Sequence, residues 1–110
     1  MIRYRLLLLI LAQGLAGAAF AEGLCIDGHP APRRANLTYG GLPPRHGYER
    51  DHCVPLGLGG ADDVSNVRYQ ALAEARVKDA DEQVAIENFC AGIWSLGQAR
   101  AWLEERWPCR

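Results

Sequence analysis

Four cysteines constrain what this chain of 110 residues can fold into more than any other feature. An even number of cysteines in a small chain predicts a disulfide framework. Such a domain has a modest hydrophobic core, and each bridge would add about 2–4 kcal/mol to its stability. Four cysteines allow three pairings, and their spacing alone does not choose between them. The positions concerned are Cys25, Cys53, Cys90 and Cys109.

A zinc site made of the four thiolates is the alternative to disulfides. Structural zinc sites are built around closely spaced cysteine pairs, most often with two residues between them. No such pair occurs here, since at least eighteen residues separate each cysteine from the next. The spacing therefore favours disulfides over zinc.

The N-terminal stretch has the layout of a secretory signal peptide. Two arginines among the first five residues precede an apolar run at positions 6–11, and Ala19-Phe20-Ala21 offers small residues where a signal peptidase would read them. We therefore expect residues 1–21 to be removed on export to the periplasm or the medium, with no stable membrane association afterwards. An uncleaved anchor is the alternative, although the apolar run is too short to span a bilayer.

The expected exported part, residues 22–110, is mildly acidic. Loss of the two leading arginines leaves ten basic against thirteen acidic residues, a net charge of −3 with histidine neutral. Nucleic-acid-binding domains usually carry a basic surface, so this balance argues weakly against such a partner. A local cluster can still supply positive charge, and the first half of the domain offers one. Its members are Arg33, Arg34, Arg45 and Arg50.

The order of elements predicts an α+β domain. Residues 22–47 hold four of the six prolines and read as an irregular arm. Residues 52–56 are apolar and predict a short strand, the glycines at positions 57–60 a tight turn, and residues 66–69 a second strand. We expect a two-strand, one-helix core over residues 48–90, followed by a C-terminal helix over residues 93–107.

Helical spacing begins near Leu72 and continues to Phe89. Ala73, Val77, Ala80 and Val84 are three or four residues apart, which places them on one face of the predicted helix. Gly92 is a natural stop.

A capping box, Ser95 with Gln98 three residues later, predicts the start of the second helix. Leu96, Ala99 and Leu103 give this helix an apolar stripe, and Pro108 ends it.

Asp51 and His52 are the clearest candidates for catalytic or metal-binding residues. Neighbours in a strand point to opposite sides, so one can hold a metal ion while the other faces substrate. A neutral imidazole suits proton abstraction from water, and a carboxylate suits Mg²⁺. Asn66 could accept a hydrogen bond from the imidazole. The plainer interpretation is a surface histidine beside an aspartate.

The whole pattern resembles the ββα-metal (His-Me finger) motif of HNH endonucleases, in particular small exported bacterial proteins of that type. Tyr-Glu-x-Asp-His occupies residues 48–52, Pro-Leu-x-Leu-Gly-Gly residues 55–60, and Ala-x-x-Lys-Asp residues 75–79, with Asn66 between the last two. The resemblance covers roughly residues 46–107. It implies a small HNH-like ββα domain carrying an irregular arm and a C-terminal helix, stapled by disulfides.

The resemblance also implies a role for each residue. His52 would be the general base that activates water, Asn66 would orient it, and Asp51 would bind the metal ion. The implied cofactor is one divalent ion, Mg²⁺ in the first place, with Mn²⁺, Zn²⁺ and Ni²⁺ as alternatives. The implied partner is nucleic acid, with DNA as the expected substrate.

One position departs from the family pattern. The second metal ligand is expected on the helix at position 75, where this chain has alanine. Asp79 is our substitute, with Glu82 and Glu74 as alternatives. Equally, Lys78, Asp79 and Glu82 could form a solvated helix face with an ion pair four residues apart.

The resemblance finally suggests a disulfide pairing. Cys53 and Cys109 look like a pair added to the family pattern, which leaves Cys25 to tie the arm to Cys90 at the helix end. The leading hypothesis is thus a metal-dependent nuclease that hydrolyses phosphodiester bonds. The alternative is a non-catalytic binding or structural protein on the same scaffold.

Overall fold

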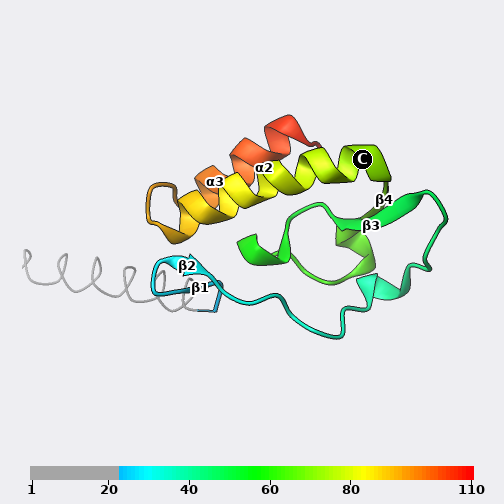
Figure 1. The fold of residues 1–110 in the computed structure, drawn as a ribbon, viewed down its shortest axis with the longest axis horizontal. Coiled ribbons are helices and arrows are strands. Elements are labelled where there is room, and N and C mark those ends of the chain that lie inside the picture. Colours follow the sequence, from blue (N-terminus) through cyan, green and yellow to red (C-terminus); the bar gives the residue numbers. More distant parts are fainter. Residues whose placement is uncertain (1–22) are drawn as a thin grey trace, which may run out of the picture.

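The computed structural model describes residues 23–110, in which two helices lie side by side above two small β-hairpins (Figure 1). Helix α2 spans Leu72–Cys90 and helix α3 spans Leu96–Arg106. The predicted signal peptide lies outside the described residues. None of the described helices is long and apolar enough to cross a membrane.

Both described sheets are antiparallel pairs. Strand β1, Cys25–Ile26, pairs with β2, His29–Pro30, while β3, Tyr48–His52, pairs with β4, Val67–Ala71. In the second pair Asp51 lies opposite Arg68. Within residues 23–110 the chain is therefore a small α+β protein, as predicted.

The first predicted strand was misplaced. Residues 52–56 do not form a strand, since β3 ends at His52 and a single turn of 3₁₀ helix follows at Leu56–Leu58. Pro55 starts this turn because it has no N–H to continue the ladder, while its carbonyl accepts from the N–H groups of Leu58 and Gly60, each at 2.9 Å. The second strand begins one residue later than predicted and runs two residues further.

Helix α2 has the predicted length but buries a different face. Val77 is 57% exposed and Val84 42%, and the other two residues of the predicted apolar stripe are also exposed. The buried residues are instead Ala75, Lys78 and Ala85. Small residues are buried here because they let neighbouring elements approach the helix axis closely.

The core lies between α2, α3 and the turn after β3. Its fully buried members come from all three of these segments, and tryptophan, phenylalanine and aliphatic side chains pack around them. These members are Leu58, Ala85, Ala99 and Leu103.

Helix α3 forms as predicted. The side chain of Ser95 accepts from the N–H of Gln98, and that of Gln98 accepts from the N–H of Ser95, so the capping box is complete. Trp94 and Trp102 pack against the core, with their ring centroids 5.3 Å apart.

Two disulfides join the arm and the C-terminus to this core. Cys25 is bonded to Cys90 and Cys53 to Cys109, the same partners that the resemblance suggested. The first ties β1 to the end of α2, and the second ties the residue after β3 to the tail after α3. Two disulfides fit an oxidising, exported environment.

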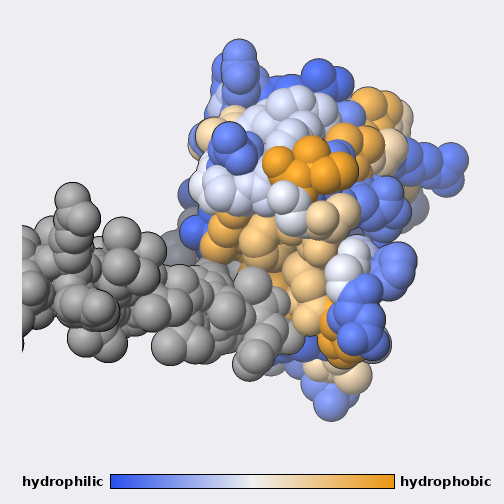
Figure 2. Space-filling view, turned by 90° about the vertical axis from the view of Figure 1, so that its left-hand side faces the viewer, coloured by the Kyte–Doolittle hydropathy of each residue, from blue (hydrophilic) through white to orange (hydrophobic). Residues whose placement is uncertain are grey.

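Apolar residues also gather on the surface at the end of the molecule where β1 and the α2–α3 connection lie (Figure 2). The exposed large hydrophobic side chains of these two segments are Ile26 and Ile93.

Candidate functional site

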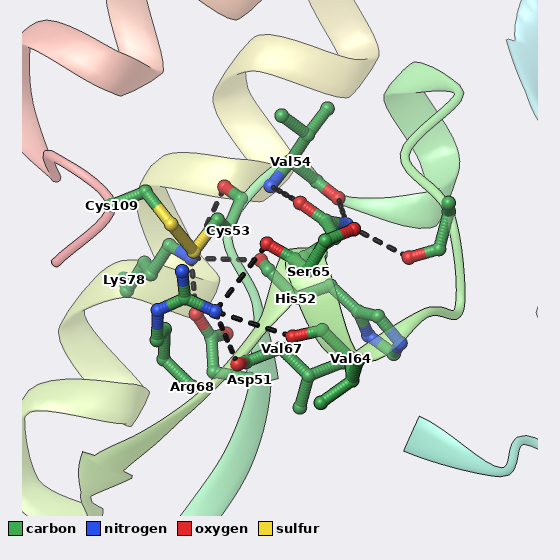
Figure 3. Close-up of a disulfide and its surroundings, with 12 residues drawn as sticks. Asp51, His52, Cys53, Val54, Val64, Ser65, Val67, Arg68, Lys78 and Cys109 are labelled. Carbon is green, nitrogen blue, oxygen red and sulfur yellow. Dashed lines mark hydrogen bonds and ion pairs between the residues drawn. A yellow bond between two sulfur atoms is a disulfide. The ribbon is translucent and has the colours of Figure 1, made fainter. Parts of the chain in front are cut away.

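Asp51 and His52 stand at the end of β3 and point to opposite sides of the strand, as their adjacency predicts. The Asp51 side chain turns towards Lys78 of α2, whereas the His52 imidazole turns away from that helix (Figure 3). The site therefore has two halves, an imidazole half and a carboxylate half, separated by the strand backbone.

The imidazole of His52 is held by an aspartate that the sequence did not single out. Nε2 of His52 lies 2.8 Å from Oδ1 of Asp62, and the two side chains are only 11% and 7% exposed. The ring also stacks on Tyr39, with the centroids 5.1 Å apart. One hydrogen bond and one stacking contact thus fix the orientation of the ring.

The carboxylate of Asp62 is itself anchored by the arm. It accepts hydrogen bonds from the N–H of Thr38 at 2.7 Å and the N–H of Tyr39 at 2.8 Å. The hydrogen bond from His52, followed by that from Thr38, lowers the pKa of Asp62 to about 2. Asp62 is therefore ionised at neutral pH, so Nε2 of His52 donates and Nδ1 is left as the acceptor nitrogen of the neutral ring.

The arm reaches this position through a glycine contact. Gly40 adopts a φ of +63°, and a Cβ added there would lie 2.1 Å from the backbone nitrogen of Val64. Because only glycine tolerates both constraints, the turn at Tyr39–Gly41 can pack directly on the loop that carries Asp62. Sequence reasoning missed Asp62 because its partners in the arm lie more than twenty residues away.

Asn66 does not orient His52 directly, contrary to expectation. Its Oδ1 accepts from the N–H of Val54 at 3.0 Å, and its Nδ2 donates to the carbonyls of Val54 and Ala61, both at 2.9 Å. The amide is therefore fully used in bracing the loop between β3 and β4. Gly60 is required in the same loop, because a Cβ there would lie 1.8 Å from the carbonyl oxygen of Val54.

Asp51 is paired with a buried lysine. Nζ of Lys78, a side chain only 3% exposed, donates to Oδ2 of Asp51 and lies 3.3 Å from Oε1 of Glu82. Burial raises the pKa of Asp51, and the hydrogen bond from Lys78 opposes this rise. Burial likewise raises the pKa of Glu82 to about 7, against the charge of Lys78. The interpretation of Lys78, Asp79 and Glu82 as a solvated helix face was correct in its ion pair between Lys78 and Glu82 and in the exposure of Asp79, but wrong for Lys78, which is buried.

The residues expected to hold a metal ion do not form a ready donor set. Asp51 and Glu82 are already engaged by Lys78, and Ala75 is buried without a donor atom. Asp79 and Glu74 are exposed. Over residues 23–110, no three His, Cys, Asp or Glu side chains are grouped so that they could hold a metal ion. Because Lys78 already balances the charge of Asp51, the arrangement does not fit a resident metal ion on Asp51.

A cleft of about 430 Å³ is lined by both Asp51 and His52. The arm and β3 supply three arginines to its lining, and β3 and α2 together supply four carboxyl groups. The arginines are Arg33, Arg34 and Arg50, and the carboxyl groups are those of Glu49, Asp51, Asp79 and Glu82. Arg45, the fourth arginine of the predicted cluster, lies instead over the ring of Tyr48, 4.3 Å from its centroid.

Comparison of the chain with protein family models, with curated proteins and with solved structures found no match. The case for function therefore depends on the geometry of the site and on the motif.

Proposed function

We propose that this chain is an exported nuclease on an HNH-like scaffold, which hydrolyses phosphodiester bonds with DNA as its expected substrate. The observation that carries the proposal is the His52–Asp62 pair, of which His52 lines the cleft. A histidine whose Nε2 donates to an ionised aspartate presents Nδ1 as a base, and the imidazolium that forms on protonation is stabilised by the same aspartate.

The order of elements supports the scaffold part of the proposal. A strand carrying Asp51 and His52 at its end, a glycine-containing loop braced by Asn66, a second strand and a helix follow one another in the order that the resemblance implies. The periplasm or the medium is the proposed place of action, in keeping with the two disulfides.

Three arginines near the imidazole support a phosphate-containing substrate, although four carboxyl groups line the same cleft. Arg33, Arg34 and Arg50 line the cleft together with His52. A guanidinium group can donate two parallel hydrogen bonds to the oxygens of one phosphate. Such contacts would place the phosphate backbone of a nucleic acid beside the imidazole of His52. A water molecule that gives a proton to Nδ1 of His52 would then attack the phosphorus atom. The P–O bond to one sugar oxygen would break, and that oxygen would leave as a hydroxyl after taking a proton from solvent.

The non-catalytic alternative also has an observation in its favour. Asp51, the metal ligand that the resemblance implies, is paired with Lys78 and so lacks the free charge that would attract a metal ion. A protein that binds nucleic acid or another partner in the cleft without cutting it would have no need of that ion.

Cleavage of supercoiled plasmid, single-stranded DNA and RNA by the purified oxidised protein tests the proposal, with each substrate offered in Mg²⁺, in Mn²⁺ and in EDTA. We expect His52→Ala to lower the cleavage rate by about 10²–10⁴-fold, the usual contribution of a general base. Asp62→Asn should also lower it, because the amide can hold the ring with Nε2 as acceptor and thereby leave Nδ1 protonated.

His46→Ala is the matched control, since His46 is exposed and is not among the residues that line the cleft. Equal cleavage by the parent, His52→Ala and His46→Ala proteins would contradict the proposal. If the protein binds DNA but cuts it in none of these conditions, the non-catalytic alternative is favoured.

A further inference from the structure

Lys78 is the one buried charged residue that the structure shows between residues 23 and 110. Removal of an ammonium group from water costs several kcal/mol unless other groups compensate for the lost hydration. The groups that surround the Nζ atom of Lys78 must therefore compensate for the hydration that the ammonium loses on burial.

Those groups are all oxygen atoms. Besides the carboxylates of Asp51 and Glu82, Nζ approaches the backbone carbonyl of His52 at 3.0 Å and that of Cys53 at 3.5 Å. Carboxylate and carbonyl oxygens are the ligands that Ca²⁺ and Mg²⁺ prefer. The ammonium thus occupies a pocket of oxygen atoms that would suit a cation of another kind.

Ala75 lies on the same buried face of α2 as Lys78. The resemblance places the second metal ligand at position 75, and the alanine there is 1% exposed and has no donor atom. Helix α2 therefore places an ammonium group at the end of β3 from position 78. At position 75 it provides no side-chain atom that could bind a metal ion.

We propose that the Lys78 ammonium group replaces a divalent metal ion in this site. It balances the charge of Asp51, and by binding the carbonyl oxygen of His52 it holds the backbone of the residue whose side chain serves as base. Lys78 is thus a positioning residue, and the native site requires no metal ion. Only the catalytic part of this inference rests on the proposed function.

Calorimetric titration of the purified oxidised protein with Ca²⁺ and with Mn²⁺ tests the replacement. We expect no one-to-one binding by the parent protein. Lys78→Ala removes the ammonium and leaves its oxygen atoms, so it should bind one ion with a Kd of about 10⁻³ M or tighter, the range of weak oxygen-ligand sites. The double variant Lys78→Ala with Asp51→Asn should lose that binding.

Arg76→Ala is the matched control, because Arg76 is an exposed cation two residues away on the same helix. It should bind no ion, which separates a specific effect of position 78 from a change in net charge. Failure of folded Lys78→Ala to bind either ion would overturn the replacement.

The parent protein provides a test that does not depend on how the variant folds. Its unfolding temperature should be the same in EDTA and in Ca²⁺, whereas that of Lys78→Ala should rise with Ca²⁺. One-to-one binding of an ion by the parent, lost on Asp51→Asn substitution, would show a native metal site and overturn the inference.

Activity distinguishes this inference from the proposed function. We expect the parent to cut nucleic acid in EDTA, and Lys78→Ala to cut at least about tenfold more slowly in EDTA, with recovery in Mn²⁺. Cleavage by the parent only with an added metal ion would support the proposed function and overturn the inference. A parent that neither cuts nor binds metal would overturn the proposed function and leave Lys78 as a structural cation.

Discussion

At the scale of single residues, the site depends on how two acidic side chains are paired. Asp62 accepts hydrogen bonds from His52 and from the arm, so its pKa falls, while Asp51 is partly buried beside Lys78 and this burial raises its pKa. The two carboxylates lie on opposite sides of β3 and serve different purposes. Asp62 orients the proposed base, and Asp51 balances a buried cation.

The low pKa of Asp62 predicts how stability depends on pH. A carboxyl whose pKa falls from 3.8 to about 2 on folding contributes stability that is complete above about pH 4 and is lost as the pH falls through 2. Asp62→Asn should therefore unfold more easily than the parent at pH 5, and the difference should shrink between pH 4 and pH 2. Urea unfolding at each pH measures it.

Asp27→Asn is the control for this series, because Asp27 is exposed in the β1–β2 turn and asparagine tolerates its φ of +51°. Its stability should follow that of the parent at every pH. A constant difference between Asp62→Asn and the parent from pH 5 to pH 2 would contradict the assignment.

At the scale of elements, helix α2 shows that spacing identifies a helix but not its buried face. The valines at positions 77 and 84 are spaced correctly for a core stripe, yet they face solvent. The buried face is narrow and made of small residues with one lysine, because α3 and β3 approach α2 closely there. Close approach of helices favours alanine over larger side chains.

Substitutions on the two faces of α2 should therefore differ in effect. Val77→Lys should change the free energy of unfolding by no more than about 0.5 kcal/mol, as is usual for surface positions. Ala85→Leu should lower it by about 1–3 kcal/mol, because Ala85 is fully buried against Leu58 and α3 and there is no room for the added atoms. Urea unfolding monitored by circular dichroism compares them. The opposite order would contradict the packing of α2.

At the scale of the whole molecule, the disulfides join segments that are far apart in the sequence. They link residues 65 and 56 positions apart and so fasten the arm and the C-terminal tail to the core. The fully buried core contains few large side chains, and we attribute much of the cohesion of the molecule to these covalent links.

Removal of either bridge should therefore be costly. We expect the Cys25→Ser/Cys90→Ser and Cys53→Ser/Cys109→Ser double variants each to lose about 2–4 kcal/mol of unfolding free energy. Limited proteolysis should then cut the arm first in the former and the C-terminal tail first in the latter. Parent-like stability in both variants would show that the core alone holds the fold.

What the sequence determined by itself is local. The ends of α2, the capping box of α3 and the opposite directions of Asp51 and His52 follow from interactions between residues no more than four positions apart. An even number of cysteines likewise predicted disulfides without reference to the fold.

What only the tertiary structure decided is which distant groups meet. Asp62 reaches the imidazole because the arm folds back on the loop after β3, and Lys78 reaches Asp51 because α2 packs across the end of the strand. Both contacts join residues in separate elements, and no local pattern of polarity or spacing encodes them. Their energies depend on burial, which is a property of the packed molecule and not of any single segment.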